Sequence, residues 1–239
     1  MRMSRRTVLY GIVGGVALEY TGTYDYVGNG TKGYAVLKTS GTLTIKGVVD
    51  LCLVGGGGRG ANGDQDGSGV SADYDGGAGG AGGYVNNYFA QKLDNSFSIT
   101  IGAGSTSQYS AGAQTNVGTT YTASGGSSAY NKTAAVGRGT SGKGGHKYAG
   151  GGSGSPSSGE NGVFPWNDST NFSAYQVSGC GGGGGAISGN GGAGGAGGGG
   201  NGGGYSGTGE SAGSPGTPNT GGGGEIGRAS CRERVFSSV

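Results

Sequence analysis

The tract Gly76-Gly77-Ala78-Gly79-Gly80-Ala81-Gly82-Gly83-Tyr84 repeats Gly-Gly-x three times. A second tract, residues 191–196, repeats it twice and runs on into further glycines through Gly204. Three residues is the repeat of the polyproline-II helix, which has no internal hydrogen bonds. Where its faces carry only hydrogen, neighbouring helices can approach until their backbone N–H and C=O groups bond to one another. We therefore expect a lattice of polyglycine-II helices. The alternative is a set of flexible glycine linkers.

The composition divides the chain into two unequal halves. It has 67 Gly and 4 Pro among 239 residues, where ordinary proteins have roughly 7% Gly. Residues 1–121 contain 24 Leu, Ile, Val or Phe, whereas residues 122–224 contain six. The first half can bury a modest core, and the second half cannot build a conventional one. The net charge is only +2 and no basic stripe is present, so we expect no nucleic-acid partner.

Alternation of apolar and polar residues predicts several strands, and no segment has the apolar period of a helix. Leu43 and Ile45 are expected to face inward from Gly41–Lys46, as are Val49, Leu51 and Leu53 from Val49–Val54. Gly47, between these runs, predicts a tight connection or a bulge. Further strands are predicted around Tyr20, Tyr24 and Tyr26, over Ser96–Ile101 and over Val117–Tyr121. The expected fold class is all-β with little or no helix: an antiparallel β base plus a lattice of polyglycine-II helices.

Four parts are expected along the chain. They are an N-terminal arm (1–18), a β base with the first glycine tracts (19–121), the lattice with a variable loop at 156–177 (122–224), and a non-native read-through (225–239). The arm has Arg5-Arg6 before an apolar stretch, as a twin-arginine export signal does, but no Ala-x-Ala cleavage site follows. Export and a plain β-arm both stay open. This apolar stretch is far short of the ~20 apolar residues that a membrane span needs, and no other segment is expected to cross a membrane.

Residues 225–239 break abruptly from the glycine tract before them and resemble the translation of a common sequencing-library adapter. A genuine basic tail is the alternative. Without this segment the cysteines are Cys52 and Cys180, which support neither a disulfide framework nor a metal cluster.

Several segments together resemble the glycine-rich domain of bacteriophage tail-fibre adhesins and related phage structural proteins. They are Thr39–Thr44, Val49–Gly58, Ser96–Gly104, Thr119–Gly126 and Gly203–Gly207. The resemblance implies a polyglycine-II sandwich on a β base, with variable loops at one end that contact host surface receptors. Members close with a short aliphatic strand, which we do not find in this sequence. An unpaired sheet edge is therefore expected beside Leu43–Ile45 or Val49–Leu53.

Some motifs partly match those of catalytic or nucleotide-binding sites. Gly55-x-Gly57-x-x-Gly60 follows a strand, as a dinucleotide fingerprint does, but the residues after it will not open a helix. Residues 137–143 approach a phosphate-binding loop, yet Gly144 replaces the hydroxyl residue that would hold Mg²⁺. His146 is the only histidine and is expected at a solvated loop tip. We expect no active site, no catalytic residue and no cofactor, so the chain is not expected to be an enzyme.

One stretch has the ligand spacing of a calcium loop. Asn62, Asp64, Asp66 and Asp73 occupy positions 1, 3, 5 and 12, with Gly67 at position 6. Asn at the first position, Asp at the last and the lack of flanking helices weaken the match. Calcium binding and a solvated acidic loop both stay open.

The variable loop interrupts the glycine tracts with the only Trp of the chain. Aromatic faces beside short polar side chains suit the binding of sugars or of a flat protein surface. The alternative is that Phe164 and Trp166 pack on the edge of the scaffold and only cap it. The candidate receptor-binding residues are Phe164, Trp166, Asn167, Asp168, Phe172 and Tyr175.

The predicted function is that of a phage virion protein, a tail-fibre or receptor-binding component located in the tail. Its expected partners are a bacterial surface receptor, either a glycan or an outer protein, and other tail proteins. The alternative is a secreted or cell-surface glycine-rich structural protein of the bacterium. An ice-binding bundle is disfavoured, since no regular Thr or Ala face runs through the tracts.

Overall fold

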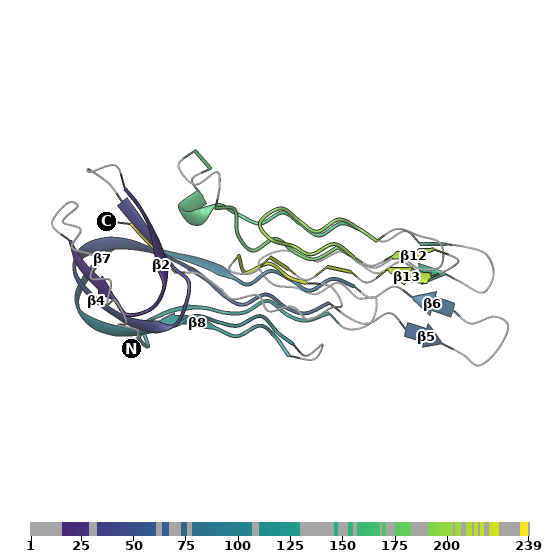
Figure 1. Ribbon diagram of the computed structural model, residues 1–239, viewed down its shortest axis with the longest axis horizontal. Helices are drawn as coiled ribbons and strands as arrows, with labels where there is room; N and C mark the ends of the chain where they lie inside the picture. Colours follow the sequence, from purple (N-terminus) through teal and green to yellow (C-terminus); the bar gives the residue numbers. More distant parts are fainter. Residues whose placement is uncertain are drawn as a thin grey trace, which may run out of the picture.

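The protein has a curved β-sheet at one end and a bundle of extended segments that run away from it (Figure 1). The all-β prediction is confirmed: the described residues form strands and a single 3₁₀ turn, η1 (Pro165–Asn167), and no α-helix. This computed structural model describes residues 16–28, 33–60, 64–66, 73–75, 78–106, 110–129, 146–147, 153–154, 157–167, 169–170, 175–182, 191–202, 204–206, 209–211, 213–214, 216–217, 220–224 and 235–238.

The base is an antiparallel sheet with the order β2-β3-β14-β4-β7-β8-β9, and β1 lies beside the first half of β4. Because β14 is antiparallel to both β3 and β4, those two strands run parallel to each other. The strands are β1 (Ala17–Tyr20), β2 (Tyr24–Gly28), β3 (Gly33–Leu37), β4 (Gly41–Val54), β7 (Val85–Thr100), β8 (Thr115–Val117), β9 (Tyr121–Ala123) and β14 (Val235–Ser238).

The predicted alternation in β4 is confirmed in its first half, where Leu43 and Ile45 are buried and Thr44 is exposed. In the second half both faces are covered. Leu51 and Leu53 belong to the main core, whereas Cys52 and Val54 belong to a second cluster on the opposite face. The second cluster also contains Val36 and Val177, with Tyr34, Val85, Trp166 and Tyr175 packed against it. A strand that is buried on both faces loses its alternation and becomes continuously apolar.

Three strand predictions need correction. β4 continues through Gly47, and the register shift against β7 falls between Val49 and Leu51, where Ala90 has φ 52°. The strand predicted over Val117–Tyr121 is a hairpin instead: Gly118 turns the chain with φ 59° between β8 and β9. β7 begins at Val85, well before the predicted Ser96, because it follows β4 along nearly its whole length.

The expected unpaired edge is not found. β14 lies between β3 and β4, with Val235 opposite Leu37 and Leu53. The segment expected to be foreign therefore supplies the strand that was expected to be missing. That residues 225–239 are a translated sequencing adapter stays a prediction. β1 likewise begins at Ala17, inside the segment assigned to the N-terminal arm.

Backbone hydrogen bonds join the glycine tracts to one another, and their donors recur at every third residue. Gly55 and Gly58 donate to Tyr84 and Ala81, whereas Gly80 and Gly83 donate to Gly224 and Gly221. The same spacing occurs at Ala81 and Tyr84, at Gly159 and Gly162, and at Gly179 and Gly182. In a β-strand the donors that face one neighbour recur at every second residue. A period of three is the one expected of three-fold helices, so the pattern supports the polyglycine-II interpretation.

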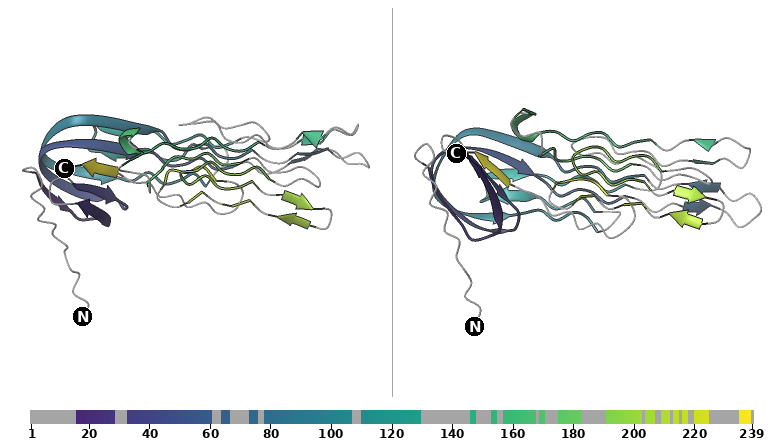
Figure 2. Two further views of the ribbon diagram at one scale, coloured as in Figure 1. Left: turned by 90° about the horizontal axis from the view of Figure 1, so that it is seen from above. Right: turned by 45° about the horizontal axis from the view of Figure 1, so that its top comes forward.

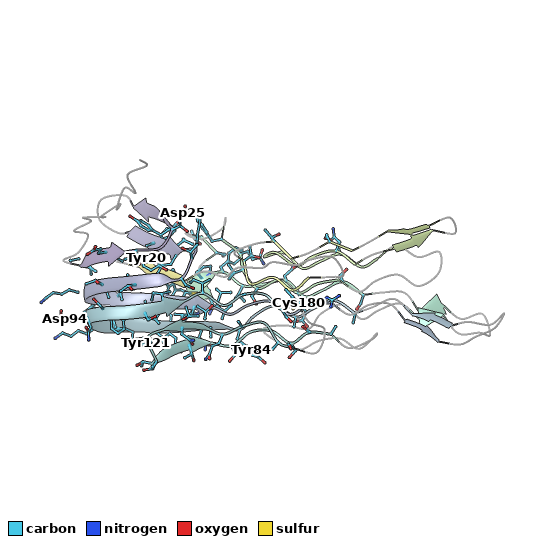
Figure 3. All side chains as sticks on the ribbon, turned by 60° about the horizontal axis from the view of Figure 1, so that its bottom comes forward. Tyr20, Asp25, Tyr84, Asp94, Tyr121 and Cys180 are labelled. Atoms are coloured by element: carbon cyan, nitrogen blue, oxygen red, sulfur yellow. The ribbon has the colours of Figure 1, made fainter. Side chains whose placement is uncertain are left out.

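The lattice needs glycine because the tracts lie almost in backbone contact. A Cβ on Gly80 would come 2.0 Å from the carbonyl oxygen of Gly58, and one on Gly223 would meet the carbonyl of Gly80. A few side chains are accommodated between the tracts. Cys180, labelled in Figure 3, is fully buried, and its Sγ accepts the N–H of Gly82 at 3.4 Å. Among the side chains that Figure 3 draws, many gather on the base.

Candidate functional site

The tracts run back and forth between the base and the far end of the molecule (Figure 2). Residues 55–58 leave β4, and residues 81–84 return antiparallel to them into β7. At the far end lie short paired strands, of which β5, β6, β12 and β13 are labelled in Figure 1.

The far-end hairpins form two small sheets. β5 (Asp64–Asp66), β6 (Asp73–Asp75), β10 (His146–Lys147) and β11 (Ser153–Gly154) pair in the order β11-β10-β6-β5. β12 (Gly204–Ser206) pairs with β13 (Gly209–Ser211). Segments about 70 residues apart in sequence therefore meet in the first sheet, where His146 lies opposite Asp75. His146 was expected in a loop but lies in a short strand.

The proposed calcium ligands occupy a hairpin. Asp66 lies opposite Asp73, and Asp64 lies opposite Asp75, whereas Asn62 lies outside the described residues. In a calcium loop the ligands follow one another around a single ion; here the spacing produces two paired strands. Calcium binding at these residues stays a prediction.

Residues within the imitated dinucleotide fingerprint, which spans 55–60, take part in the lattice. The N–H groups of Gly55, Gly56 and Gly58 donate to Tyr84, Ala113 and Ala81 at 2.8–2.9 Å. These donors are therefore occupied by protein carbonyls and do not cradle a phosphate. The second imitation, residues 137–143, lies outside the described residues.

The variable loop lies beside the base, away from the far-end hairpins. Figure 1 shows η1 close to the sheet, and η1 contacts β7. Trp166 is half-buried against the second cluster, and Tyr175 packs edge-to-face on Tyr34 of β3 with ring centroids 5.6 Å apart. Of the other candidates, Phe164 is half-buried and Asn167 is exposed, while Asp168 and Phe172 lie outside the described residues.

Two consecutive residues of η1 adopt left-handed backbone conformations, with φ 51° at Trp166 and φ 58° at Asn167. Such conformations cost energy for a non-glycine residue and persist where the surroundings enforce them. Here the Asn167 N–H donates to the Phe164 carbonyl at 2.9 Å, and the Trp166 ring packs on the sheet. The hydrogen bond to Phe164 and the packing of the Trp166 ring therefore both stabilise this backbone conformation.

Trp166 also sits next to a buried thiol. Burial raises the pKa of Cys52 to about 12, and a backbone hydrogen bond involving Trp166 partly opposes that rise. The thiol is neutral at physiological pH, and it packs as a small apolar group.

The loop therefore has two kinds of residue. Trp166 and Tyr175 act as a cap over the second cluster, which favours the packing interpretation for them. Phe164 and Asn167 retain exposed surface, and their binding role stays a prediction. Sequence reasoning missed Tyr34, which orients Tyr175. The apolar run Gly33–Leu37, bounded by Lys38 and Thr39, is a strand signal that could have found it.

Among the described residues, no helix combines the length and the apolar character needed to cross a membrane. Comparison with protein-family models, with curated proteins and with solved structures gave no match to this chain.

Proposed function

We propose that this protein is a structural component of a bacteriophage virion, a tail-fibre or receptor-binding protein that contacts the bacterial surface. The observation that supports it most is the separation of two parts. A base with a conventional core lies at one end, and short hairpins are held at the far end of a hydrogen-bonded lattice. Loops on a rigid scaffold are common sites of recognition.

The lattice suits this role because its order does not depend on side chains. Buried glycines such as Gly58, Gly80 and Gly223 donate their N–H groups to carbonyls of neighbouring tracts at 2.8–2.9 Å. Pre-organised hairpins lose little conformational entropy when they bind, so they bind more tightly than flexible loops would.

Binding of the labelled full chain to a panel of bacterial strains tests the proposal. A far-end variant combines Tyr74→Ser, Tyr205→Ser and Glu210→Ser. A junction variant combines Phe164→Ala and Asn167→Ala. The matched control, Lys46→Gln with Asp94→Asn, removes an exposed ion pair of the base with Nζ–Oδ2 3.3 Å. The far-end variant should lose roughly tenfold or more in affinity, and the control should bind like the wild type.

The outcomes separate the alternatives. Loss of binding in the junction variant alone, with unchanged melting, would move the receptor site to the variable loop. Immunogold labelling then identifies the carrier: label on tail structures of virus particles supports the virion proposal. Label on the bacterial envelope in cultures without virus would support the alternative, a glycine-rich surface protein of the bacterium.

A further inference from the structure

Aromatic and amide side chains alternate along β7 where the chain leaves the lattice. Tyr84, directly before β7, is followed by Asn86 and Tyr88 at every second position, the spacing of residues on one face of a strand. The bulge at Ala90 shifts the parity by one residue, so that Gln91 continues the series. We call the Tyr/amide row these four residues together with their neighbour on β9: Tyr84, Asn86, Tyr88, Gln91 and Tyr121.

The residues between them belong to the other face of the sheet. Val85 packs against the second cluster, and Asn87 lies opposite Cys52 of that cluster. Phe89 and Lys92 likewise alternate with members of the row, so they face away from it. The row itself has no charged residue.

The row lies at the margin of the main core, partly open to solvent. Tyr88 and Tyr121 are half-buried against that core and pack edge-to-face, with ring centroids 5.0 Å apart. Tyr84 is 42% exposed, and Asn86 is exposed as well. Figure 3 labels Tyr84 and Tyr121, which both lie along the lower side of the molecule in that view. The row therefore combines anchored aromatic rings with accessible ones.

The amides of the row are held in place by hydrogen bonds. Asn86 Nδ2 donates to the carbonyl of Thr122 at 2.7 Å. Gln91 Oε1 accepts the hydroxyl of Tyr121 at 3.0 Å, and Gln91 Nε2 donates to the carbonyl of Phe89 at 2.6 Å. A primary amide has two donors and an oxygen that can accept twice. Each amide thus keeps capacity for a ligand in an orientation that is already fixed, which lowers the entropy lost on binding.

The most exposed ring of the row stands on a fixed backbone. The N–H of Tyr84 donates to the carbonyl of Ser124, and its carbonyl accepts the N–H of Gly55, both at 2.9 Å. These bonds position the ring next to the Asn86 amide without covering it.

We propose that the Tyr/amide row binds a neutral saccharide chain. A pyranose ring has an apolar C–H face, which can pack on a tyrosine ring, and hydroxyl groups at its rim, which can pair with the donors and acceptors of an amide. An acidic ligand would find no cation in the row to pair with. This site is in the base, so it is separate from the far-end hairpins and does not depend on their function.

The test measures binding to the full chain by isothermal titration calorimetry. The neutral probes are maltohexaose, cellohexaose and N-acetylchitohexaose. Hexagalacturonate is the acidic probe, and decaproline represents an extended neutral peptide. At least one neutral saccharide should bind, whereas hexagalacturonate and decaproline should not.

Variants of the full chain show whether the saccharide binds at the row. Tyr84→Ala with Asn86→Ala should weaken binding roughly tenfold or more. Its urea midpoint should stay close to that of the wild type, because the Thr122 carbonyl keeps the hydroxyl of Tyr88 as a second donor at 2.9 Å. Tyr84→Phe keeps the aromatic face and should bind like the wild type. The matched control is Phe89→Ala, which removes a 58% exposed ring from the other face of the same strand and should also leave binding unchanged.

Four results would overturn the proposal. They are no binding by any neutral saccharide, equal or tighter binding of hexagalacturonate, binding that survives the Tyr84→Ala and Asn86→Ala double change, and an equal loss of binding in Phe89→Ala. Binding of decaproline that the double variant abolishes, with no saccharide bound, would identify the row as a peptide site and would also refute it.

Discussion

Gly80→Ala probes the lattice where the tracts lie closest. Gly80 donates to the Gly224 carbonyl at 2.8 Å and accepts from the Gly181 N–H at 2.9 Å. Its added Cβ would lie 2.0 Å from the carbonyl oxygen of Gly58, a backbone atom with no rotamer to change. Ordinary contact begins at 3.4 Å, so the tract of Gly58 has to retreat by about 1.4 Å.

That displacement breaks two hydrogen bonds made by Gly58. Its N–H donates to Ala81 at 2.8 Å, and its carbonyl accepts from Gly224 at 3.1 Å. A buried backbone group left without a partner costs about 1–3 kcal/mol. Alanine also lowers the conformational entropy of the unfolded chain, which stabilises the folded state by only about 0.4–1 kcal/mol. We therefore expect Gly80→Ala to lower the free energy of unfolding by about 2–5 kcal/mol, which corresponds to roughly 5–15 °C in Tm.

The matched control is Gly181→Ala. Gly181 is also buried in the lattice, but its added Cβ would meet nothing closer than 3.1 Å. Small shifts can relieve that approach, so the change should stay within about 1 kcal/mol. Urea titration and calorimetry of both variants measure the difference. Equal midpoints for Gly80→Ala and Gly181→Ala would refute the close-packed lattice, and so would a Gly80→Ala protein as stable as the wild type.

Three further predictions concern the base, the thiol and the tracts. Trp166→Ala should lower the free energy of unfolding by about 2–4 kcal/mol in urea titration, because it uncovers the second cluster. Trp166→Phe should restore most of the loss. Unchanged stability of Trp166→Ala would instead support a binding role for Trp166. Burial raises the pKa of Cys52 from 9.0 and that of Tyr20 from 10.0, each to about 12. Because the folded protein keeps both groups neutral, their contribution to the free energy of unfolding is complete below pH 9. This contribution should fall as the pH rises from 9 to 12, and the Cys52→Ala variant should have a flatter unfolding profile there than the wild type. Amides of residues 78–84 and 191–202 should be protected in hydrogen exchange although no large core covers them, whereas free exchange throughout both tracts would leave them as linkers.

The elements that sequence predicted best are those whose pattern is local. Leu43 and Ile45 alternate with polar residues, and they are buried as expected. The Gly-Gly-x tracts predicted the spacing of three that the hydrogen-bond donors follow. In both cases the spacing of small, apolar and polar residues along the sequence matches the period of the backbone conformation.

The elements that sequence missed depend on distant partners. The first half of β7 has no clean alternation, because Ala90 shifts the parity against β4 at the bulge. β14, Val235–Ser238, pairs with β3 and β4, which lie about 200 residues earlier in the chain. The packing of Trp166 was equally hidden, since its partners Val36 and Cys52 lie more than 100 residues earlier in the chain.

The spacing of three between donors sets a rule for changes in length. One or two residues inserted into a tract such as 78–84 would rotate every later donor to a different neighbour. Three inserted residues would add one full turn, so that the Gly83 N–H again faces the tract of Gly221 and the Tyr84 carbonyl again faces Gly55. Insertions and deletions inside the tracts should therefore be tolerated in multiples of three residues, or nine nucleotides.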